Sequence, residues 1–378
     1  MPSVSFRVFV ASFLFAGPLL LATPLLAQSN DARSKKGQSH ELGVMIPLLS
    51  LDPVEPQMDP QQPMLPSQKP IPGPVLLSAT YHFGNADKET VPVLLLHGSG
   101  GNRRDFTPLA DALANAGFAV MAVDFRGHGK STRRYEITPP QFTVQQVARS
   151  RNNRDDGRPR VVTDVVPTAP ASRRLVEFKD KDADILPRDY IDMARYDLPV
   201  FRDELLKAHD VGVCNMNRLV IVGIDRGAAL AAYQTMLDWQ DKNSPRLTKT
   251  LIMISPADLD VGVDTAKCFQ DNRWMGGGLA ALFVTPQENP NAQRLAGKIR
   301  TELMGKNPGD EAVEARFQLL SYSGEKKVKT DKGETVAPMT WAETFVNKEV
   351  ALTQKIIDFI NNRNLLFKEK EARWSRIK

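Results

Sequence analysis

The feature that most constrains this chain is an alternation of short, continuously apolar segments with segments of helical spacing. In Phe106–Ala116, for example, Leu109, Leu113 and Ala116 recur at helical spacing before Gly117. Short apolar strands separated by helices are typical of a mostly parallel sheet covered by helices on both faces, which is an α/β fold. We expect strands at Val75–Phe83, Val91–Leu96, Phe118–Phe125, Arg218–Val222, Thr248–Ile254, Leu279–Val284 and Val313–Tyr322, and helices at Phe106–Ala116, Tyr196–His209, Gly227–Trp239 and Asn347–Arg363.

Proline content and polarity set the expected domain boundaries. Nine prolines lie between Pro47 and Pro74, a density that favours extended chain, so residues 28–74 are predicted to be a linker or arm. One α/β domain should span 75–363, with little or no cap and a polar insertion at 131–189, and a basic tail should occupy 364–378. The charged run Arg149–Arg160 is typical of a solvated loop, with a lid or a partner-docking segment as the alternative.

The N-terminus has the layout of a secretory signal peptide. Arg7 precedes the apolar run Val8–Ala27, which ends in Leu25-Leu26-Ala27 before polar residues. We expect cleavage near Ala27 and a secreted or periplasmic protein. An uncleaved membrane anchor is the alternative, since about 20 apolar residues can span a bilayer.

Composition excludes several function classes. With 42% hydrophobic and 25% charged residues, the chain is typical of a soluble globular protein. The net charge of +5 comes without any nucleic-acid-binding motif, so no nucleic-acid partner is expected. No ligand cluster indicates a metal or an organic cofactor. Cys214 and Cys268 are expected to be buried thiols, with one disulfide bridge as the alternative.

Two glycine-rich motifs follow consecutive predicted strands. His97-Gly98-Ser99-Gly100-Gly101 can turn sharply and offer backbone N–H groups to a developing oxyanion, although such turns also bind phosphates or simply turn. Asp124-Phe125-Arg126-Gly127-His128-Gly129-Lys130-Ser131 is the second motif, and its His128 is interpreted as a loop histidine.

A third motif has the form of a nucleophile elbow. The strand Leu219–Val222 enters Gly223-Ile224-Asp225-Arg226-Gly227, and the helix that follows starts with small residues. Small flanking residues permit a strained strand-to-helix turn that presents the central side chain, here Asp225. The structural alternative is that Asp225 merely caps the helix N-terminus, where negative charge is favourable.

In this order, the three motifs resemble the α/β-hydrolase fold family over about Val75 to Arg363. Asp225 is similar to the aspartate nucleophile of haloalkane dehalogenases and epoxide hydrolases, in which the carboxylate attacks a saturated carbon and forms an ester. The resemblance implies that the backbone N–H groups of Ser99 and Arg226 form an oxyanion site. It also implies that four residues support the conformation of these motifs: His97, Gly98, Gly223 and Gly227.

The chain departs from the family where the base is expected. The resemblance places a catalytic histidine after the final strand, but the five histidines lie at positions 40, 82, 97, 128 and 209. Glu288 stands where the family places its acid, and Glu325 could serve as a base if its environment raised its pKa. His97 is a further alternative base. Two functions therefore remain open, a hydrolase acting on a small molecule through Asp225 and a non-catalytic descendant that binds or stabilises; the oligomeric state is also open.

Overall fold

The structure is a computed structural model that describes residues 38–45, 58–59, 62–66, 71–138, 141–149, 160–169, 172–177, 187–240, 245–257, 264–270, 278–305, 311–330, 333–366, 374–375 and 377. The expected signal peptide and its cleavage site lie outside these residues, as does most of the charged run 149–160. Among the described residues, no helix combines the length and apolar character needed to cross a membrane. Cys214 and Cys268 are both buried free thiols.

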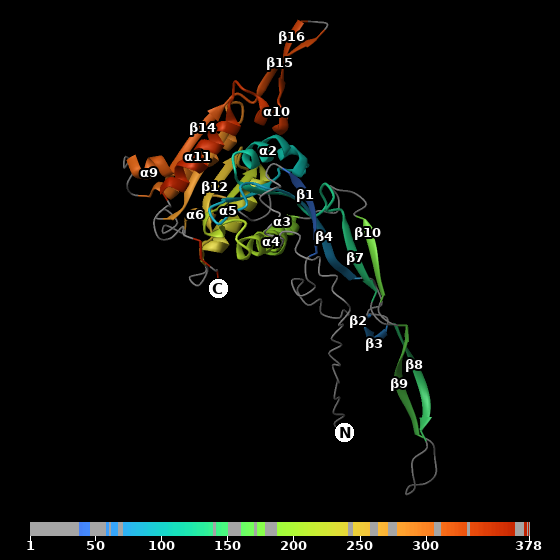
Figure 1. Ribbon diagram of the computed structural model, residues 1–378. Coiled ribbons are helices and arrows are strands. Elements are labelled where there is room, and N and C mark those ends of the chain that lie inside the picture. The colour runs from blue at the N-terminus through green and yellow to red at the C-terminus, as the bar shows by residue number, and fades with distance from the viewer. Residues whose placement is uncertain are drawn as a thin grey trace.

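The centre of the molecule is a ten-stranded sheet in the order β10-β7-β4-β6-β5-β11-β12-β13-β14, with β1 paired to β4 (Figure 1). From β6 to β14 all neighbours are parallel, whereas β1, β4, β7 and β10 pair antiparallel. This arrangement confirms the predicted α/β class. The strands are β1 Ser39–Met45, β4 Ile71–His82, β5 Pro92–Leu96, β6 Ala119–Asp124, β7 Arg133–Thr138, β10 Ser172–Glu177, β11 Leu219–Ile224, β12 Thr248–Ile254, β13 Ala280–Pro286 and β14 Phe317–Tyr322.

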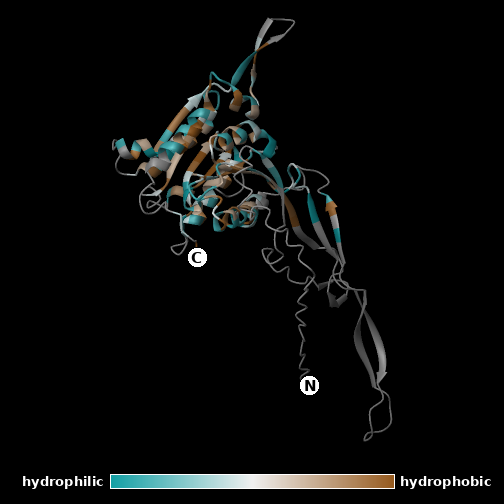
Figure 2. Ribbon diagram, viewed as in Figure 1, coloured by the Kyte–Doolittle hydropathy of each residue, from teal (hydrophilic) through white to brown (hydrophobic). Residues whose placement is uncertain are grey.

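Two hydrophobic cores lie on opposite faces of the sheet. In β5, Val93 and Leu95 enter one core while Leu94 and Leu96 enter the other, because successive side chains of a strand point to opposite faces. Figure 2 shows hydrophobic residues, in brown, in strands of the central sheet. The first core is covered by α2 Thr107–Asn115, α10 Trp341–Val346 and α11 Leu352–Leu366, and the second by α4 Leu198–Asp210, α5 Arg226–Gln240 and α8 Pro290–Met304.

Shorter helices connect these elements. A 3₁₀ helix η4 precedes α2, and α3 and the π-helical η5 lead into α4. The bounds are η4 Arg103–Phe106, α3 Pro187–Asp192, η5 Met193–Asp197, η6 Met216–Arg218, α6 Lys267–Gln270 and α9 Glu311–Arg316.

Two expected elements near the C-terminus are wrong in part. The first half of the expected strand Val313–Tyr322 is the helix α9, because Glu311–Arg316 contains strong helix formers. The closing helix begins at Leu352 and not at Asn347, and Ala351, immediately before it, has a φ of 47°. Residues with positive φ cannot continue a right-handed helix.

The insertion 131–189 contains strands that the sequence analysis did not predict. It holds β7, β10 and a ribbon of β8 Gln141–Arg149 paired with β9 Arg160–Ala169, which extends away from the body in Figure 1. Valine and threonine, which favour strands, recur in both β8 and β9. The expected arm 28–74 likewise contributes β1 to the main sheet and a small ribbon of β2 Met58–Asp59 and β3 Gln62–Pro66.

A second hairpin extends from the opposite end of the molecule. It consists of β15 Glu325–Thr330 and β16 Gly333–Pro338, and it follows β14 directly (Figure 1). This hairpin occupies the part of the chain where the resemblance places the histidine-bearing loop.

Candidate active site

Asp225 stands at the sharp turn between β11 and α5. Its φ is 50°, in the left-handed region that side chains other than glycine rarely adopt. Its N–H donates to the carbonyl of Ile254 on the neighbouring strand at 2.9 Å, which fixes the turn against the sheet. Residues held in such conformations cost about 1–3 kcal/mol and cluster at functional sites.

Glycine is required on both sides of this turn. A Cβ on Gly223 would lie 2.3 Å from the carbonyl oxygen of Gly227, and a Cβ on Gly227 would lie 2.3 Å from that of Leu96. Both contacts involve backbone atoms, which cannot rotate away. The glycines of the motif therefore allow α5 to start directly against the end of β5.

The carboxylate of Asp225 faces the glycine-rich loop after β5. The N–H of Ser99 donates to Asp225 Oδ2 at 3.1 Å, although the two residues are 126 positions apart. A Cβ on Gly98 would lie 3.2 Å from the Cβ of Asp225, so this glycine permits the close approach. An N-cap side chain instead accepts from the second or third N–H of its own helix, so the bond from Ser99 is not that of an N-cap.

Arg226 opens α5 immediately after Asp225, and its side chain is directed to another element. Its Nη1 donates to the hydroxyl of Tyr190 at 2.9 Å, and the guanidinium lies 5.2 Å from the Tyr190 ring centre. Nearby, Arg126 pairs with the buried carboxylate of Asp197, with Nε 2.8 Å from Oδ2. These contacts attach the α3–η5 segment to the start of α5 and to the loop after β6.

Both ring nitrogens of His97 are bound to backbone groups. Nε2 accepts from the N–H of Phe125 at 3.1 Å, so Nδ1 carries the proton and donates to the carbonyl of Gly98 at 2.8 Å. Burial, opposed by the Gly98 bond and reinforced by neighbouring His128, lowers the pKa of His97 to about 3. A neutral imidazole without a free nitrogen connects the two loops and cannot take a proton from water.

Acid should destabilise the protein through His97. The folded-state pKa lies below the ordinary value of 6.5, so as the pH falls the unfolded chain binds the proton first. The stability contributed by neutral His97 is complete above pH 6.5 and is lost as the pH falls toward about 3. The free energy of unfolding can change by up to about 1.4 kcal/mol per pH unit through this one group.

Between about pH 5.5 and 6.5 the carboxylates Glu41, Glu288 and Glu343, whose pKa values are lowered from 4.5, are mostly ionised in both the folded and the unfolded chain, so this window reports mainly on histidines. Buried His82 has a lowered pKa and adds in the same direction. Urea unfolding across this window should give a shallower slope for His97→Asn than for wild type. Equal slopes would contradict the assignment.

Glu288 binds the loop that follows β14. Its Oε1 accepts from Ser323 Oγ at 3.1 Å and its Oε2 from the N–H of Gly324 at 2.9 Å. The pKa of Glu288 is lowered, first by the Gly324 N–H. This carboxylate is thus committed to Ser323 and Gly324, in the loop where the resemblance places the catalytic histidine. Glu325 begins β15, with an exposed side chain.

The remaining histidines are engaged away from Asp225. His128 Nδ1 lies 3.1 Å from the Arg126 carbonyl, and His82 Nδ1 lies 3.1 Å from Asp111 Oδ1. His209 is fully buried, and its Nε2 lies 2.8 Å from the carbonyl of Ser375. His40 lies on β1, which pairs with β4 and not with any strand from β5 to β14.

One neighbouring pair was not anticipated from the sequence. Ser255, next after β12, has a φ of 47°, and its Oγ accepts from Asn289 Nδ2 at 3.2 Å. Because β12 pairs with β11, this strained serine follows the strand beside the elbow. The signal that could have found it is its place directly after an apolar strand, where ligands of parallel sheets bind.

In the part of the chain that the structure describes, no three His, Cys, Asp or Glu side chains lie close enough together to bind a metal ion.

Comparison with known proteins identifies the family. The sequence profile of the alpha/beta hydrolase family matches residues 93–346, while no curated protein matches the chain. A fungal esterase structure from Rhizomucor miehei is similar with a TM-score of 0.45 and 10% identity, covering 90% of this chain and 92% of its own.

Two prokaryotic structures are similar at the same level. A dienelactone hydrolase from Anabaena variabilis gives a TM-score of 0.42 at 11% identity, over 86% of this chain and 98% of its own. A Pyrococcus furiosus esterase gives 0.39 at 14% identity, over 78% and 92%. With the family profile matching residues 93–346 of 378, the chain belongs to the alpha/beta hydrolase family.

Proposed function

We propose that this protein is an exported hydrolase of a small molecule and that its nucleophile is the carboxylate of Asp225. The observation that carries the proposal is the hydrogen bond from the Ser99 N–H to Asp225 Oδ2 at a residue held at a φ of 50°. This hydrogen bond engages Oδ2, so Oδ1 is the oxygen that attacks. Export rests on the signal-type segment Val8–Ala27.

The first step forms an ester on Asp225. Oδ1 attacks a saturated carbon and forms a C–O bond, while the bond from that carbon to its leaving group breaks and the leaving group takes the electron pair. With a haloalkane the leaving group is halide. With an epoxide it is the ring oxygen, which then takes a proton from water.

The second step releases the product by hydrolysis. Water adds to the Cγ of the ester and loses its proton, so negative charge develops on Oδ2. The Ser99 N–H already donates to that oxygen, and the backbone N–H of Arg226 is the proposed second donor. The Cγ–Oδ1 bond then breaks, and Oδ1 leaves with the alkyl group as an alcohol that takes a proton. The water oxygen stays on Cγ, so the carboxylate is restored.

The substrate class follows from the nucleophile. Attack by a carboxylate on an acyl group would give a reactive anhydride, whereas attack on a saturated carbon gives an ester that survives. We therefore propose small epoxides or haloalkanes, with alkyl esters as the third class to be tested. Half-buried Asp225 lies beside exposed Ser99, so the carboxylate is accessible from outside.

Intact-protein mass spectrometry tests this proposal. After single-turnover mixing, wild-type protein should gain the alkyl group of a haloalkane or the whole mass of an epoxide, and peptide mapping should place it on Asp225. A p-nitrophenyl ester, which can transfer only an acyl group as a reactive anhydride, should leave no lasting adduct. Asp225→Asn keeps the size of the side chain but lacks the nucleophilic charge, so it should gain none.

Asp264→Asn is the matched control, because Asp264 also accepts backbone N–H groups at a helix start but lies in another loop. It should form the adduct as wild type does. Absence of any adduct in folded wild-type protein, or an adduct that persists in Asp225→Asn, would overturn the nucleophile.

A second candidate function is a non-catalytic binding or structural protein. It is favoured by the commitment of Glu288 to Ser323 and Gly324 and by the lack of histidine beyond His209. In that case Asp225→Asn should leave both ligand affinity and thermal stability close to wild type. The mass measurement above separates the two functions.

A further inference from the structure

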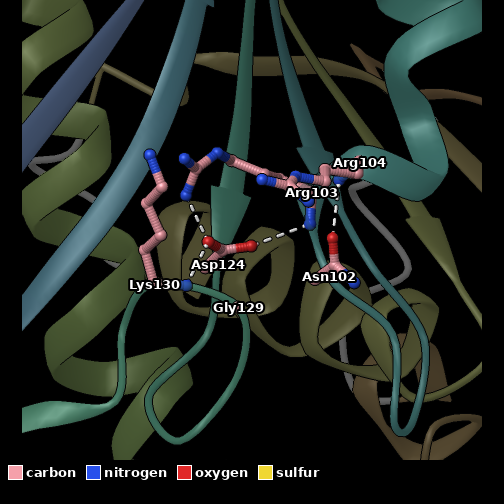
Figure 3. Close-up of a pocket in the computed structure, with 6 residues that line it drawn as sticks. All are labelled: Asn102, Arg103, Arg104, Asp124, Gly129 and Lys130. Carbon is pink, nitrogen blue, oxygen red and sulfur yellow. Dashed lines mark hydrogen bonds and ion pairs between the residues drawn. The ribbon is translucent and has the colours of Figure 1, made fainter.

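A cavity of about 240 Å³ lies on the far end of the glycine-rich loop from Asp225. It is lined by Asn102, Arg103, Arg104, Asp124, Gly129 and Lys130, drawn in Figure 3. Arg103 follows Ser99 by four positions, so one loop carries both the donor to Asp225 and the floor of this cavity.

Asp124 organises the floor of the cavity. Its Oδ1 accepts from the N–H of Arg103 and its Oδ2 from the N–H of Lys130, at 2.8 and 2.9 Å, and Arg103 Nη1 also binds Oδ2 (Figure 3). Gly129, at a φ of 52°, has no room for a Cβ, which would lie 2.3 Å from this carboxylate. The buried Asp124 is therefore saturated and holds two cationic residues in fixed positions.

A carboxylate of the chain itself already sits on these cations. Glu41 of β1 accepts from Arg103 Nη2 at 3.0 Å and from Lys130 Nζ at 2.7 Å. The pKa of Glu41 is lowered, first by the Lys130 bond. The side chain of Glu41 is nevertheless 60% exposed, so it covers the cations without being enclosed. This contact demonstrates that the two cations converge on one anionic group.

Arg104 supplies a third positive charge at the same cavity. Within the described part of the chain, its guanidinium is held by no hydrogen bond or ion pair, and its side chain is exposed. With Glu41 displaced, Asp124 is the one carboxylate among the described residues that line the cavity with Arg103, Arg104 and Lys130, and Arg103 Nε stays bound to Thr80 Oγ1. The excess of cations over carboxylates then matches a ligand with two negative charges.

We propose that this cavity is a binding site for a small dianion, a phosphate or a dicarboxylate, and that Glu41 is its intramolecular competitor. The ligand replaces the Glu41 carboxylate on Arg103 Nη2 and Lys130 Nζ and reaches Arg104. The cavity is smaller than the roughly 300–1,000 Å³ of sites for drug-sized ligands, which limits the ligand to a small molecule. The proposal does not depend on the activity of Asp225.

Isothermal titration calorimetry of the full chain tests this site, with inorganic phosphate and succinate as probes and sodium chloride at equal ionic strength as the blank. We expect binding of at least one dianion. Phosphate binding without succinate binding would assign the site to phosphates, and the reverse would assign it to dicarboxylates. Absence of both would overturn the proposal.

Two charge-removing variants locate the site. Lys130→Ala should weaken binding at least tenfold, whereas Lys207→Ala should leave it unchanged. Lys207 is the matched control because both lysines pair with a glutamate and their side chains are 52% and 53% exposed. Arg104→Ala provides a second exposed position in case Lys130→Ala disturbs the fold. Wild-type affinity in both cavity variants would place the binding elsewhere and overturn the proposal.

Glu41→Gln tests the competitor. Because the glutamine no longer carries the charge that occupies the cations, this variant should bind about two- to tenfold more tightly, the range that the loss of two ion pairs of an exposed carboxylate allows. Glu177→Gln, which removes another exposed β-strand partner of an arginine, should bind as wild type. Weaker binding by Glu41→Gln would show that Glu41 builds the site and would overturn its role as competitor.

Discussion

The ester that we propose to form on Asp225 should hydrolyse at least about 100-fold more slowly than it would beside a positioned general base, because such a base contributes roughly 10²–10⁴-fold. His97, the histidine nearest in sequence to the oxyanion loop, has both nitrogens bound to backbone groups. Glu288 is bound to Ser323 and Gly324. Glu325 is exposed at the start of β15, so we expect solvent species to deprotonate the water.

Time-resolved intact mass spectrometry measures this rate. After excess reagent is removed, loss of the adduct should accelerate about tenfold per pH unit as hydroxide increases, and added imidazole should accelerate it further. Rapid decay that is independent of pH would contradict the prediction, since it requires a positioned base. Glu288→Gln and Glu325→Gln would then identify which carboxylate supplies it.

Substitution of Gly227 by alanine should destabilise the fold by about 3 kcal/mol or more. The new Cβ would lie 2.3 and 2.4 Å from the carbonyl oxygens of Leu96 and His97, so α5 must move away from β5. Overpacking in a core commonly costs about 1–3 kcal/mol, and here both obstructing atoms are backbone. Urea unfolding followed by circular dichroism should show a lower midpoint.

Gly297 gives the matched control for this substitution. It lies inside α8, where a Cβ would meet nothing within 4 Å. Gly297→Ala should therefore raise stability by about 0.5–1 kcal/mol, the ordinary gain from replacing glycine in a helix. Wild-type stability for Gly227→Ala would mean that the elbow relaxes without cost and that its close packing is not required.

Local sequence determined most of the α/β scaffold and the form of the candidate site. Apolar runs such as Leu251–Ile254 indicated strands buried on both faces, and the structure has β12 over the expected Thr248–Ile254. Gly223 and Gly227 indicated the elbow, because only residues without a Cβ fit there. The lack of histidine after His209 was likewise determined by the sequence alone.

The sequence pattern did less well where short-range preferences compete. The insertion 131–189 was expected to be polar and no strand was predicted in it, yet it contains β8 and β9, which pair with each other. Residues 313–316, expected in a strand, belong to α9, where neighbouring helix formers outweigh a single valine. Such boundaries depend on which partner strand is available, and composition carries no information about the partner.

Only the tertiary structure decided what each polar side chain of the site contacts. Asp225 meets Ser99 because β11 lies beside β5 in the sheet order, although 126 positions separate the residues. In the same way, β1 brings Glu41 to Arg103 and Lys130. Periodicity and glycine placement are determined by neighbouring residues along the chain, whereas these contacts depend on strand order and register, which arise from packing the whole sheet.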